Sequence, residues 1–423
     1  MLKITEYKDV DFRALDLRMS EQANAEVERT VAAVLQDVRE RGDAALLDYT
    51  ERFDGVRPQP LAVSREEIDE ALTLVGDDFL AILREAAENI AAFHSMQKRE
   101  GFRMERDGIE LGQRITAIEK AGLYVPGGTA SYPSTVLMDA IPAKIAGVDE
   151  LLLCTPPGKN GKIAPAILAA AHVAGVDRIF KCGGAQAIAA LAYGTESIPR
   201  VYKIVGPGNI YVATAKRMVF GQVSIDMIAG PSDVLVIADD SARADCVAAD
   251  MLAQAEHDRL ATAVLVTTSR RLAEQTAQEV EKQLAALPRS EIAGASIRNN
   301  GKIILCASLE EAVDCANRIA PEHLELSVAD PKALLPRVRN AGSIFLGHSS
   351  PEALGDYFAG PNHTLPTMGT ARFASPLSVD DFIKKSSVTC YTGEALALVT
   401  DKIAAFARAE GLEAHARSVE VRK

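Results

Sequence analysis

The chain has 423 residues, of which 48% are hydrophobic and 25% are charged, and this composition is typical of a globular protein with roughly two to four domains. No apolar run approaches the ~18 residues of a membrane span, and the N-terminus lacks the apolar core of a signal peptide. The net charge of −12, without a long basic run, argues against nucleic acids and anionic membranes as partners.

The N-terminal part of the chain is expected to be mostly helical after a polar lead-in over residues 1–23. A helix is predicted from about Ala25 to Arg41. Ser64-Arg65-Glu66-Glu67 is a capping box that opens another helix, and a long amphipathic helix is expected from about Asp77 to Lys98. Residues 102–116 alternate apolar and polar side chains, which predicts a β-ribbon.

From about Leu123, short apolar runs alternate with helical stretches, as in parallel strands joined by crossover helices. The runs end in Gly- or Pro-rich turns, and ligands of open α/β sheets bind beyond the carboxyl ends of the strands, where such turns lie. The usual glycine fingerprint of dinucleotide binding is missing, so a dinucleotide would have to bind without it. Asn209 is placed to cap the next helix, whose N-terminus favours an anion. The strand candidates are Leu151–Cys154, Arg178–Lys181 and Val201–Val205.

A second α/β region is expected from Leu235 to about Leu346, with helices at about 269–287 and 308–319. The last block, from about Asp380, is too small to hold its own core and must dock on another surface. The predicted division is an N-terminal extension (1–23), a discontinuous first α/β domain (24–122 and 234–379), an inserted second Rossmann-like domain (123–233) and a small C-terminal domain (380–423).

Half of a divalent-metal site is indicated by Gln254 and His257. They are three residues apart on a helix predicted from about Ala242 to His257, so an amide oxygen and an imidazole nitrogen would share one face. A polar surface face is the alternative interpretation unless distant side chains complete the site. The stretches that could complete it are Asp356 and His363, expected in a loop, and Glu410–His415 near the C-terminus.

A candidate acid–base pair lies in Pro321-Glu322-His323-Leu324, at a predicted helix-to-strand junction. Adjacent residues on a strand point to opposite faces, but at a turn both side chains can face one cleft. Histidine titrates near neutral pH, and a carboxylate beside it can activate water. A surface Glu–His pair is the alternative.

Taken together, these stretches resemble the histidinol dehydrogenase family, in the family's order and over roughly residues 20 to 416. Each segment alone is weak evidence for the family, whereas the whole set in this order is highly specific for it. The matching segments are Leu123–Gly128, Gly206–Asn209, Ala229–Ser232, Gln254–His257, Ala320–Leu326, Gly355–Tyr357, Gly360–His363, Gly369–Phe373, Ser375–Phe382 and Glu410–His415.

The resemblance implies an α/β fold similar to that of aldehyde dehydrogenases, with two incomplete Rossmann-type domains and small N- and C-terminal helical extensions. The missing glycine fingerprint agrees with such incomplete domains. The resemblance also implies a homodimer with sites shared between subunits, in which the C-terminal domain docks on the partner subunit.

The activity implied is the oxidation of L-histidinol through bound L-histidinal to L-histidine, the last steps of histidine biosynthesis, with two NAD and one zinc ion per subunit. Zinc would hold the imidazole and the amine of the substrate; His323 would remove the alcohol proton and Glu322 would activate water. The implied zinc ligands are Gln254, His257, Asp356 and His415, the last from the partner subunit. These four residues and the acid–base pair Glu322 and His323 are also implied to contact the substrate. The other implied contacts are Ser232, His363 and Glu410 to the substrate, and Tyr124, Gln186 and Asn209 to NAD.

One departure from the family pattern is visible at Gly230-Pro231-Ser232-Asp233, where glutamate is expected after the serine. Aspartate keeps the charge and shortens the reach, so the change is expected to be minor. The six cysteines are scattered without a C-x-x-C pair, which favours reduced thiols and a cytoplasmic location.

Three other functions are weighed against this one. The first is that of a relative that oxidises another small polar alcohol, such as a sulfonated diol, with the same catalytic pair. A metal-dependent hydrolase would use zinc to generate hydroxide with Glu322 as its base, and would need no nicotinamide. A non-catalytic metal-binding protein would tolerate the loss of Glu322 or His323.

Overall fold

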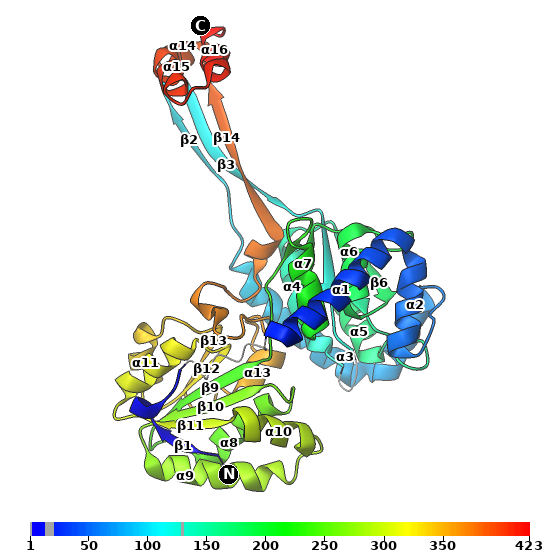
Figure 1. Ribbon diagram of the computed structural model, residues 1–423, viewed down its shortest axis with the longest axis vertical. Helices are drawn as coiled ribbons and strands as arrows, with labels where there is room; N and C mark the ends of the chain where they lie inside the picture. The colour runs from blue at the N-terminus through cyan, green and yellow to red at the C-terminus, as the bar shows by residue number, and fades with distance from the viewer. Residues whose placement is uncertain (1, 13–20, 128–130) are drawn as a thin grey trace.

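The computed structural model describes residues 2–12, 21–127 and 131–423, and these form two lobes and a long projecting arm (Figure 1). Each lobe is built on a parallel sheet with helices on both faces. The predicted α/β class is therefore confirmed. Among the described residues, no helix combines the length and apolarity that a membrane crossing requires.

The first lobe contains a five-stranded parallel sheet in the order β6-β5-β4-β7-β8. This is the strand order of a dinucleotide-binding fold that lacks its sixth strand, as the resemblance implied. Two of the three predicted strands were placed well, whereas the third is shorter than expected. The strands are β4 (Lys120–Tyr124), β5 (Glu150–Thr155), β6 (Arg178–Lys181), β7 (Lys203–Val205) and β8 (Ser224–Ile225).

Both faces of this sheet are buried because successive side chains of a strand point to opposite sides. In β5, Leu151 and Leu153 pack in the core beneath α3, α4 and α5, whereas Leu152 and Cys154 pack beneath α1, α2, α6 and α7. The helices are α1 (Glu21–Arg41), α2 (Asp43–Asp54), α3 (Arg65–Ser95), α4 (Pro133–Ala146), α5 (Pro165–Ala174), α6 (Gly184–Tyr193) and α7 (Ile210–Val219).

The second lobe contains a six-stranded parallel sheet in the order β1-β11-β10-β9-β12-β13. Its strands also alternate: Val234 and Val236 face α8, α9 and α10, whereas Leu235 and Ile237 face α11 and α12. The strands are β1 (Ile4–Glu6), β9 (Asp233–Ala238), β10 (Thr262–Thr267), β11 (Lys302–Leu305), β12 (His323–Ser327) and β13 (Ser343–Leu346). The helices are α8 (Ala244–Ala255), α9 (Arg270–Leu284), α10 (Ser290–Asn300), α11 (Leu309–Ile319), α12 (Pro331–Leu334) and α13 (Glu352–Tyr357). Short 3₁₀ turns occur at Tyr7–Asp9, Leu335–Arg337, Thr370–Arg372 and Val379–Phe382.

The helical N-terminal part packs differently from the expected division. Residues 24–122 were grouped with 234–379, but α1, α2 and α3 cover the five-stranded sheet, and β4 belongs to that sheet. The lead-in 1–23 was expected to be a helical extension, yet β1 pairs in parallel with β11 as an edge strand of the six-stranded sheet. Residue 1 and residues 13–20 of that lead-in lie outside the described residues, as do residues 128–130 with Gly128 of the matching segments.

The capping box at Ser64 is confirmed at the start of α3. The Ser64 hydroxyl accepts a hydrogen bond from the Glu67 amide at 3.3 Å, and the Glu67 carboxylate accepts one from the Ser64 amide at 3.0 Å. A single helix follows where two were predicted, with a kink at Gly76, whose φ of 75° lies in the region that glycine tolerates.

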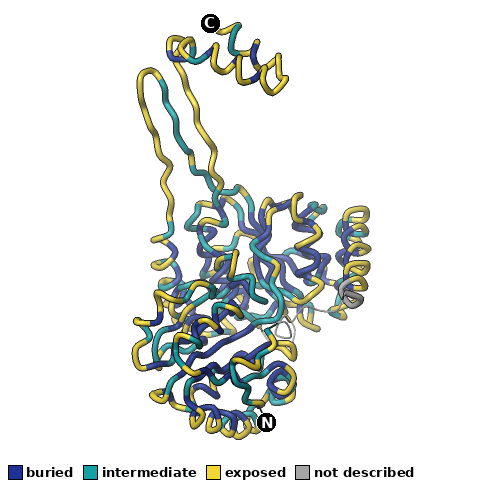
Figure 2. Tube along the Cα trace, turned by 60° about the vertical axis from the view of Figure 1, so that its left-hand side comes forward, coloured by how far each residue is buried: buried dark blue, intermediate teal, exposed yellow. Residues whose placement is uncertain are grey.

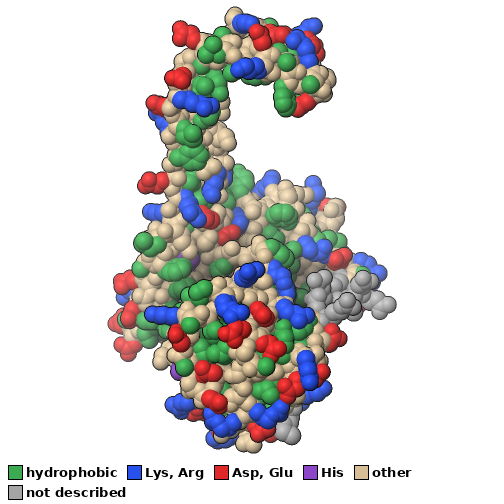
Figure 3. Space-filling model, turned by 90° about the vertical axis from the view of Figure 1, so that its left-hand side faces the viewer, with side chains coloured by type: hydrophobic (Ala, Val, Ile, Leu, Met, Phe, Trp, Pro, Cys, Tyr) green, Lys and Arg blue, Asp and Glu red, His purple; other side chains and the backbone are tan. Residues whose placement is uncertain are grey.

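The predicted β-ribbon forms most of the arm, which stands clear of both lobes (Figures 2 and 3). Strand β14 comes from the far end of the chain and adds to the ribbon in the antiparallel order β14-β3-β2. Three helices close the tip. The elements are β2 (Phe102–Arg106), β3 (Ile109–Ala117), β14 (Ile383–Tyr391), α14 (Gly393–Ala397), α15 (Thr400–Ala409) and α16 (Glu413–Glu420).

Candidate active site

A cavity of about 1020 Å³ lies between the lobes and is lined by residues of both. The first lobe contributes Pro207, Gly208 and Asn209, at the carboxyl ends of its strands, where open α/β sheets bind ligands. The second lobe contributes Ser232, Glu322 and His323, at the amino ends of β9 and β12. The two sheets therefore present opposite ends to one cavity.

The parallel pairing of β9 with β12 fixes the predicted acid–base pair. The Asp233 amide donates to the Glu322 carboxylate at 3.0 Å, and the Glu322 amide donates to the Asp233 carboxylate at 2.9 Å. The Asp233 carbonyl lies 3.3 Å from Nδ1 of His323. The family departure at Asp233 thus lies within the site, where the shorter side chain still reaches the Glu322 amide.

Helix α13 brings two further carboxylates to His323. Oε1 of Glu352 lies 3.9 Å from Nδ1, and Oδ1 of Asp356 lies 3.6 Å from Nε2. Glu352 is buried, with only 2% of its surface exposed, and its backbone amide donates to the Glu325 carboxylate at 2.8 Å, which ties the start of α13 to β12. The imidazole is therefore surrounded by acids.

The electrostatics of the acid–base pair follow from this enclosure. Burial raises the pKa of Glu322 to about 7, although the neighbouring His323 opposes the shift. Burial alone would lower the pKa of His323, but the carboxylates of Glu352, Glu322 and Asp356 raise it well above its ordinary value. Burial also raises the pKa of Glu352 to about 8. So many acids around one imidazole favour a bound cation.

The predicted metal ligands His257 and Asp356 converge, together with Glu352. One ligand atom from each of these three residues lies within 4.8 Å of the others. Helix α8 ends at Ala255, not at His257 as predicted, and the His257 amide donates to the Gln254 carbonyl in the turn that follows. The turn, and not a shared helical face, therefore directs the imidazole into the cluster.

The Gln254 side chain is fully buried beside Glu352. In the carboxamide orientation that satisfies the Glu352 carboxylate, the Gln254 nitrogen donates to the two Glu352 oxygens at 2.7 and 3.1 Å. That orientation leaves the amide oxygen available as a ligand. An imidazole, a carboxylate and an amide oxygen are donors that zinc accepts, so these side chains fit the ion that the resemblance implies.

His363, the predicted substrate contact, is held by two polar neighbours. Its Nδ1 lies 2.9 Å from the Asp356 carbonyl, and its Nε2 lies 3.2 Å from the Thr135 hydroxyl on α4. The carbonyl can only accept, so Nδ1 carries the proton and Nε2 accepts from Thr135. His363 therefore joins the loop after α13 to the first lobe.

The three predicted NAD contacts differ in their positions. Asn209 lines the cavity and caps α7, where its side-chain oxygen accepts from the amides of Tyr211 and Val212 at 3.0 and 3.2 Å. Tyr124 and Gln186 are buried at the ends of β4 and the start of α6, and the Tyr124 hydroxyl accepts from the Gly184 amide at 3.1 Å. The side-chain oxygen of Gln186 has no hydrogen-bond partner among the described residues.

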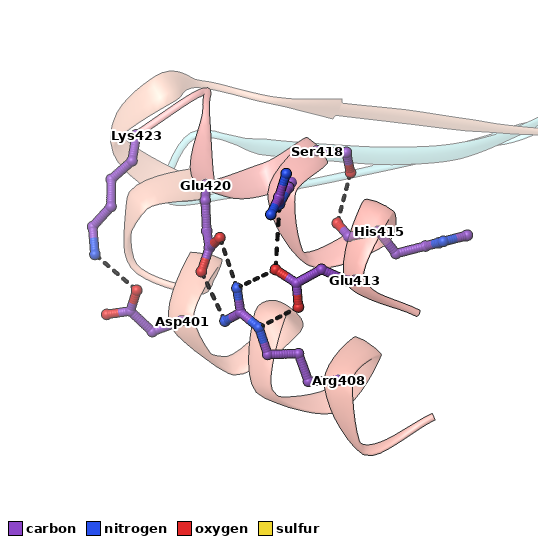
Figure 4. Close-up of polar contacts among 8 residues, drawn as sticks. Asp401, Arg408, Glu413, His415, Ser418, Glu420 and Lys423 are labelled. Carbon is purple, nitrogen blue, oxygen red and sulfur yellow. Dashed lines mark hydrogen bonds and ion pairs between the residues drawn. The ribbon is translucent and has the colours of Figure 1, made fainter. Parts of the chain in front are cut away.

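Glu410 and His415 lie at the tip of the arm, and the chain does not bring them to its own cavity (Figures 1 and 4). The tip is held by Arg408, whose guanidinium pairs with Glu413 and Glu420 at 2.8 and 2.9 Å, while the His415 side chain points away from these pairs. The Ser418 hydroxyl donates to the His415 carbonyl at 2.8 Å, and the imidazole has no hydrogen-bond partner in the described part of the chain.

Glu352 is a residue of the site that the sequence analysis missed. Its neighbours in the sequence are not histidines or cysteines, and an acid is usually exposed. Asp356 was expected in a loop but lies on the helix α13, so the spacing of four residues that brings Glu352 beside it was not used as a signal.

The fold and the site together define an α/β enzyme in which a buried acid–imidazole pair lies beside a cluster of His257, Glu352 and Asp356 that could hold a metal ion. A family profile described as histidinol dehydrogenase matches residues 17–423. The histidinol dehydrogenase of Geobacillus kaustophilus is 57% identical over 96% of each chain, and that of Bacillus subtilis is 54% identical over 97% of this chain and 96% of its own. The crystal structure of histidinol dehydrogenase from Elizabethkingia anophelis superimposes with a TM-score of 0.93 at 40% identity, covering 100% of this chain and 98% of that one. The chain is an enzyme that belongs to the histidinol dehydrogenase family.

Proposed function

We propose that this enzyme carries out two successive NAD-dependent oxidations of L-histidinol, through bound L-histidinal, to L-histidine. The observation that carries the proposal is the convergence of the buried Glu322–His323 pair and the cluster of His257 and Asp356 on one cavity, across from the Asn209 turn. We propose Gln254, His257 and Asp356, with the partner subunit's His415, as the zinc ligands.

When bound, zinc holds the imidazole and the amine of the substrate, and NAD accepts a hydride in each oxidation. In this proposal Ser232 and His363 bind the substrate with Glu410 of the partner subunit, and Tyr124, Gln186 and Asn209 bind NAD. Ser232 and His363 line the cavity, which supports the first assignment. The exposed N-terminus of α7, which begins after Asn209, supports the assignment of the NAD contacts, because helix N-termini favour phosphate groups.

His323 acts as the base that removes the alcohol proton. The Asp233 carbonyl can only accept a hydrogen bond, so Nδ1 of His323 donates to it, and in the neutral form of the ring, which is the form that acts as the base, the lone pair is on Nε2. Nε2 has no hydrogen-bond partner among the described residues, which leaves it available to the substrate hydroxyl.

Glu322 activates the water that adds to the aldehyde, so that a hydrate is oxidised in the second reaction. One of its oxygens is held by the Asp233 amide, and the other can accept a proton from water. A pKa of about 7 suits this role, because a general base works best near the operating pH.

We further propose a homodimer in which the tip of the arm completes the site of a second copy. The tip has only a small core of alanines, yet it exposes Leu398, Phe406 and Val421 by 70% or more. Exposed apolar groups on so small a unit favour docking on another surface. A cytoplasmic location is supported by the six cysteines, all of which are unpaired.

The test is to count the NAD reduced per L-histidinol consumed, before chelation, after chelation and after zinc is returned. We expect two NADH per substrate, no reaction after chelation, and recovery with zinc. One NADH per substrate would show that the aldehyde escapes, and would remove Glu322 from the proposed role. If histidinol gives no reduction, a sulfonated diol tests the related alcohol oxidation, and turnover without NAD would favour a hydrolase.

Changing Glu352 to Gln should lower the affinity for zinc by about tenfold or more, as the loss of a group that orients a metal ligand usually does. The new carboxamide cannot accept two hydrogen bonds from Gln254 in the way the carboxylate does. Zinc retained after dialysis against graded chelator is the measurement. Glu310→Gln, on the exposed side of α11, is the matched control, and equal zinc retention by Glu352→Gln and the parent would contradict the role.

A further inference from the structure

A buried ion pair holds the turn that carries Asn209 in place. Nζ of Lys216, on α7, lies 2.5 Å from Oδ1 of Asp226, just after β8, and the two side chains are only 2% and 1% exposed. Lys216 Nζ also donates to the Gly206 carbonyl at 2.7 Å, while Asp226 accepts from the Gly206 amide at 2.8 Å. A single pair therefore holds both peptide groups of the residue with which the turn begins.

The conformation at Gly206 needs such support. Its φ of +116° is one that other residues rarely adopt, and a side chain there would meet the Tyr124 carbonyl at 2.1 Å. Beyond Gly206, the residues Pro207, Gly208 and Asn209 line the cavity, and Asn209 begins α7. A shift of the Gly206 peptide would therefore move the surface that faces the cavity.

A gain in folding stability alone does not account for this buried ion pair. Buried charges lose hydration, and replacing such a pair by apolar groups of similar size is often neutral or stabilising. The cluster is further enclosed by Asp139, whose pKa is raised well above its ordinary value, first by burial and then by Asp226. The raised pKa favours the neutral form of Asp139, in which Lys216 and Asp226 form a balanced pair of charges.

We propose that Lys216 and Asp226 are positioning residues for the dinucleotide: they set the shape of the turn 206–209 so that it accepts NAD. The inference rests on the proposed binding of NAD at Asn209. Lys216 and Asp226 themselves do not line the cavity, so they act through Gly206.

The test is the affinity for NADH of the double variant Lys216→Met/Asp226→Asn, measured by fluorescence titration of the full-length protein. The double change removes both charges, so neither partner is left as an unpaired buried ion, and Asn can still accept from the Gly206 amide. We expect the Kd for NADH to rise at least tenfold and the KM for NAD to rise with it, while the KM for histidinol and the zinc content stay within about twofold of the parent.

Lys203→Met is the matched control, because Lys203 is a buried lysine at the amino end of β7 whose ion pair, with Asp381, faces away from the turn. We expect its Kd for NADH to equal that of the parent. A folded double variant that binds NADH as tightly as the parent overturns the proposal, as does an equal loss of affinity in Lys203→Met. If the parent itself fails to bind NADH, the proposed dinucleotide function is refuted, and this inference falls with it.

Should the double variant not fold, Lys216→Arg provides the second comparison, since it keeps the charge but cannot place a single ammonium between Gly206 and Asp226. A rise in the KM for NAD with an unchanged KM for histidinol supports the positioning role. Equal changes in the two KM values, or no change in either, overturn it.

Discussion

Replacing His323 with Asn should lower turnover by about 10²- to 10⁴-fold, which is the usual contribution of a general base. Asparagine can keep a hydrogen bond to the Asp233 carbonyl, but it has no lone pair on nitrogen with which to remove the alcohol proton. His323 is not among the proposed zinc ligands, so the zinc content should stay near that of the parent. The measurements are the rate of NADH formation at saturating histidinol and the metal content of the same sample.

Glu322→Gln is the companion variant, because it removes the neighbouring carboxylate and should spare the first oxidation. In that variant, NADH formation should stop near one equivalent per substrate, with aldehyde accumulating. A His323→Asn enzyme that retains full turnover would refute the role of the imidazole. Loss of zinc together with turnover would instead place His323 in the metal site.

Replacing His415 with Asn should remove zinc from the isolated variant and abolish its activity. The imidazole lies at the tip of the arm, outside the cavity of its own chain, so the proposed ligand must come from a second copy. A mixed dimer of His415→Asn with His257→Asn subunits should regain one intact site, because one of its cavities then combines an unaltered His257 with an unaltered partner His415.

The comparison needs the two variants alone, and a mixture of His415→Asn with wild-type subunits, as references. Zinc binding and NADH formation should appear in the mixed dimers and be missing from either variant alone. If His415→Asn alone retains its zinc, the residue leaves the ligand set. If the mixture gives no recovery, the ligand does not cross between subunits.

Local patterns predicted the elements of the sheets, but not the lobe on which the first helices would pack. Short apolar runs such as Leu151–Cys154 specify a strand buried on both faces. The apolar stripe of an amphipathic helix predicts that one face is buried, but it does not predict on which sheet the helix packs. For this reason the grouping of residues 24–122 with the second lobe was wrong. The strand β1 was missed because three residues carry too little periodicity.

The candidate site was predictable where residue type restricts chemistry, and unpredictable where packing decides. Glu322 and His323 were expected to face one cleft, and the β9–β12 pairing places them there. Glu352 belongs to the site because the fold buries it, and the burial of a single acidic residue cannot be predicted from the sequence. The path of β14 into the arm depends on pairing with strands from the other end of the chain, and no local signal encodes that distance.

The reciprocal hydrogen bonds between Asp233 and Glu322 join residues that are 89 positions apart in the chain. Contacts between such distant residues close large loops and form more slowly than the local contacts of helices. The acid–base pair therefore cannot exist in a chain whose helices have formed but whose β9 and β12 have not met. We therefore expect catalytic competence to arise only when β9 and β12 pair.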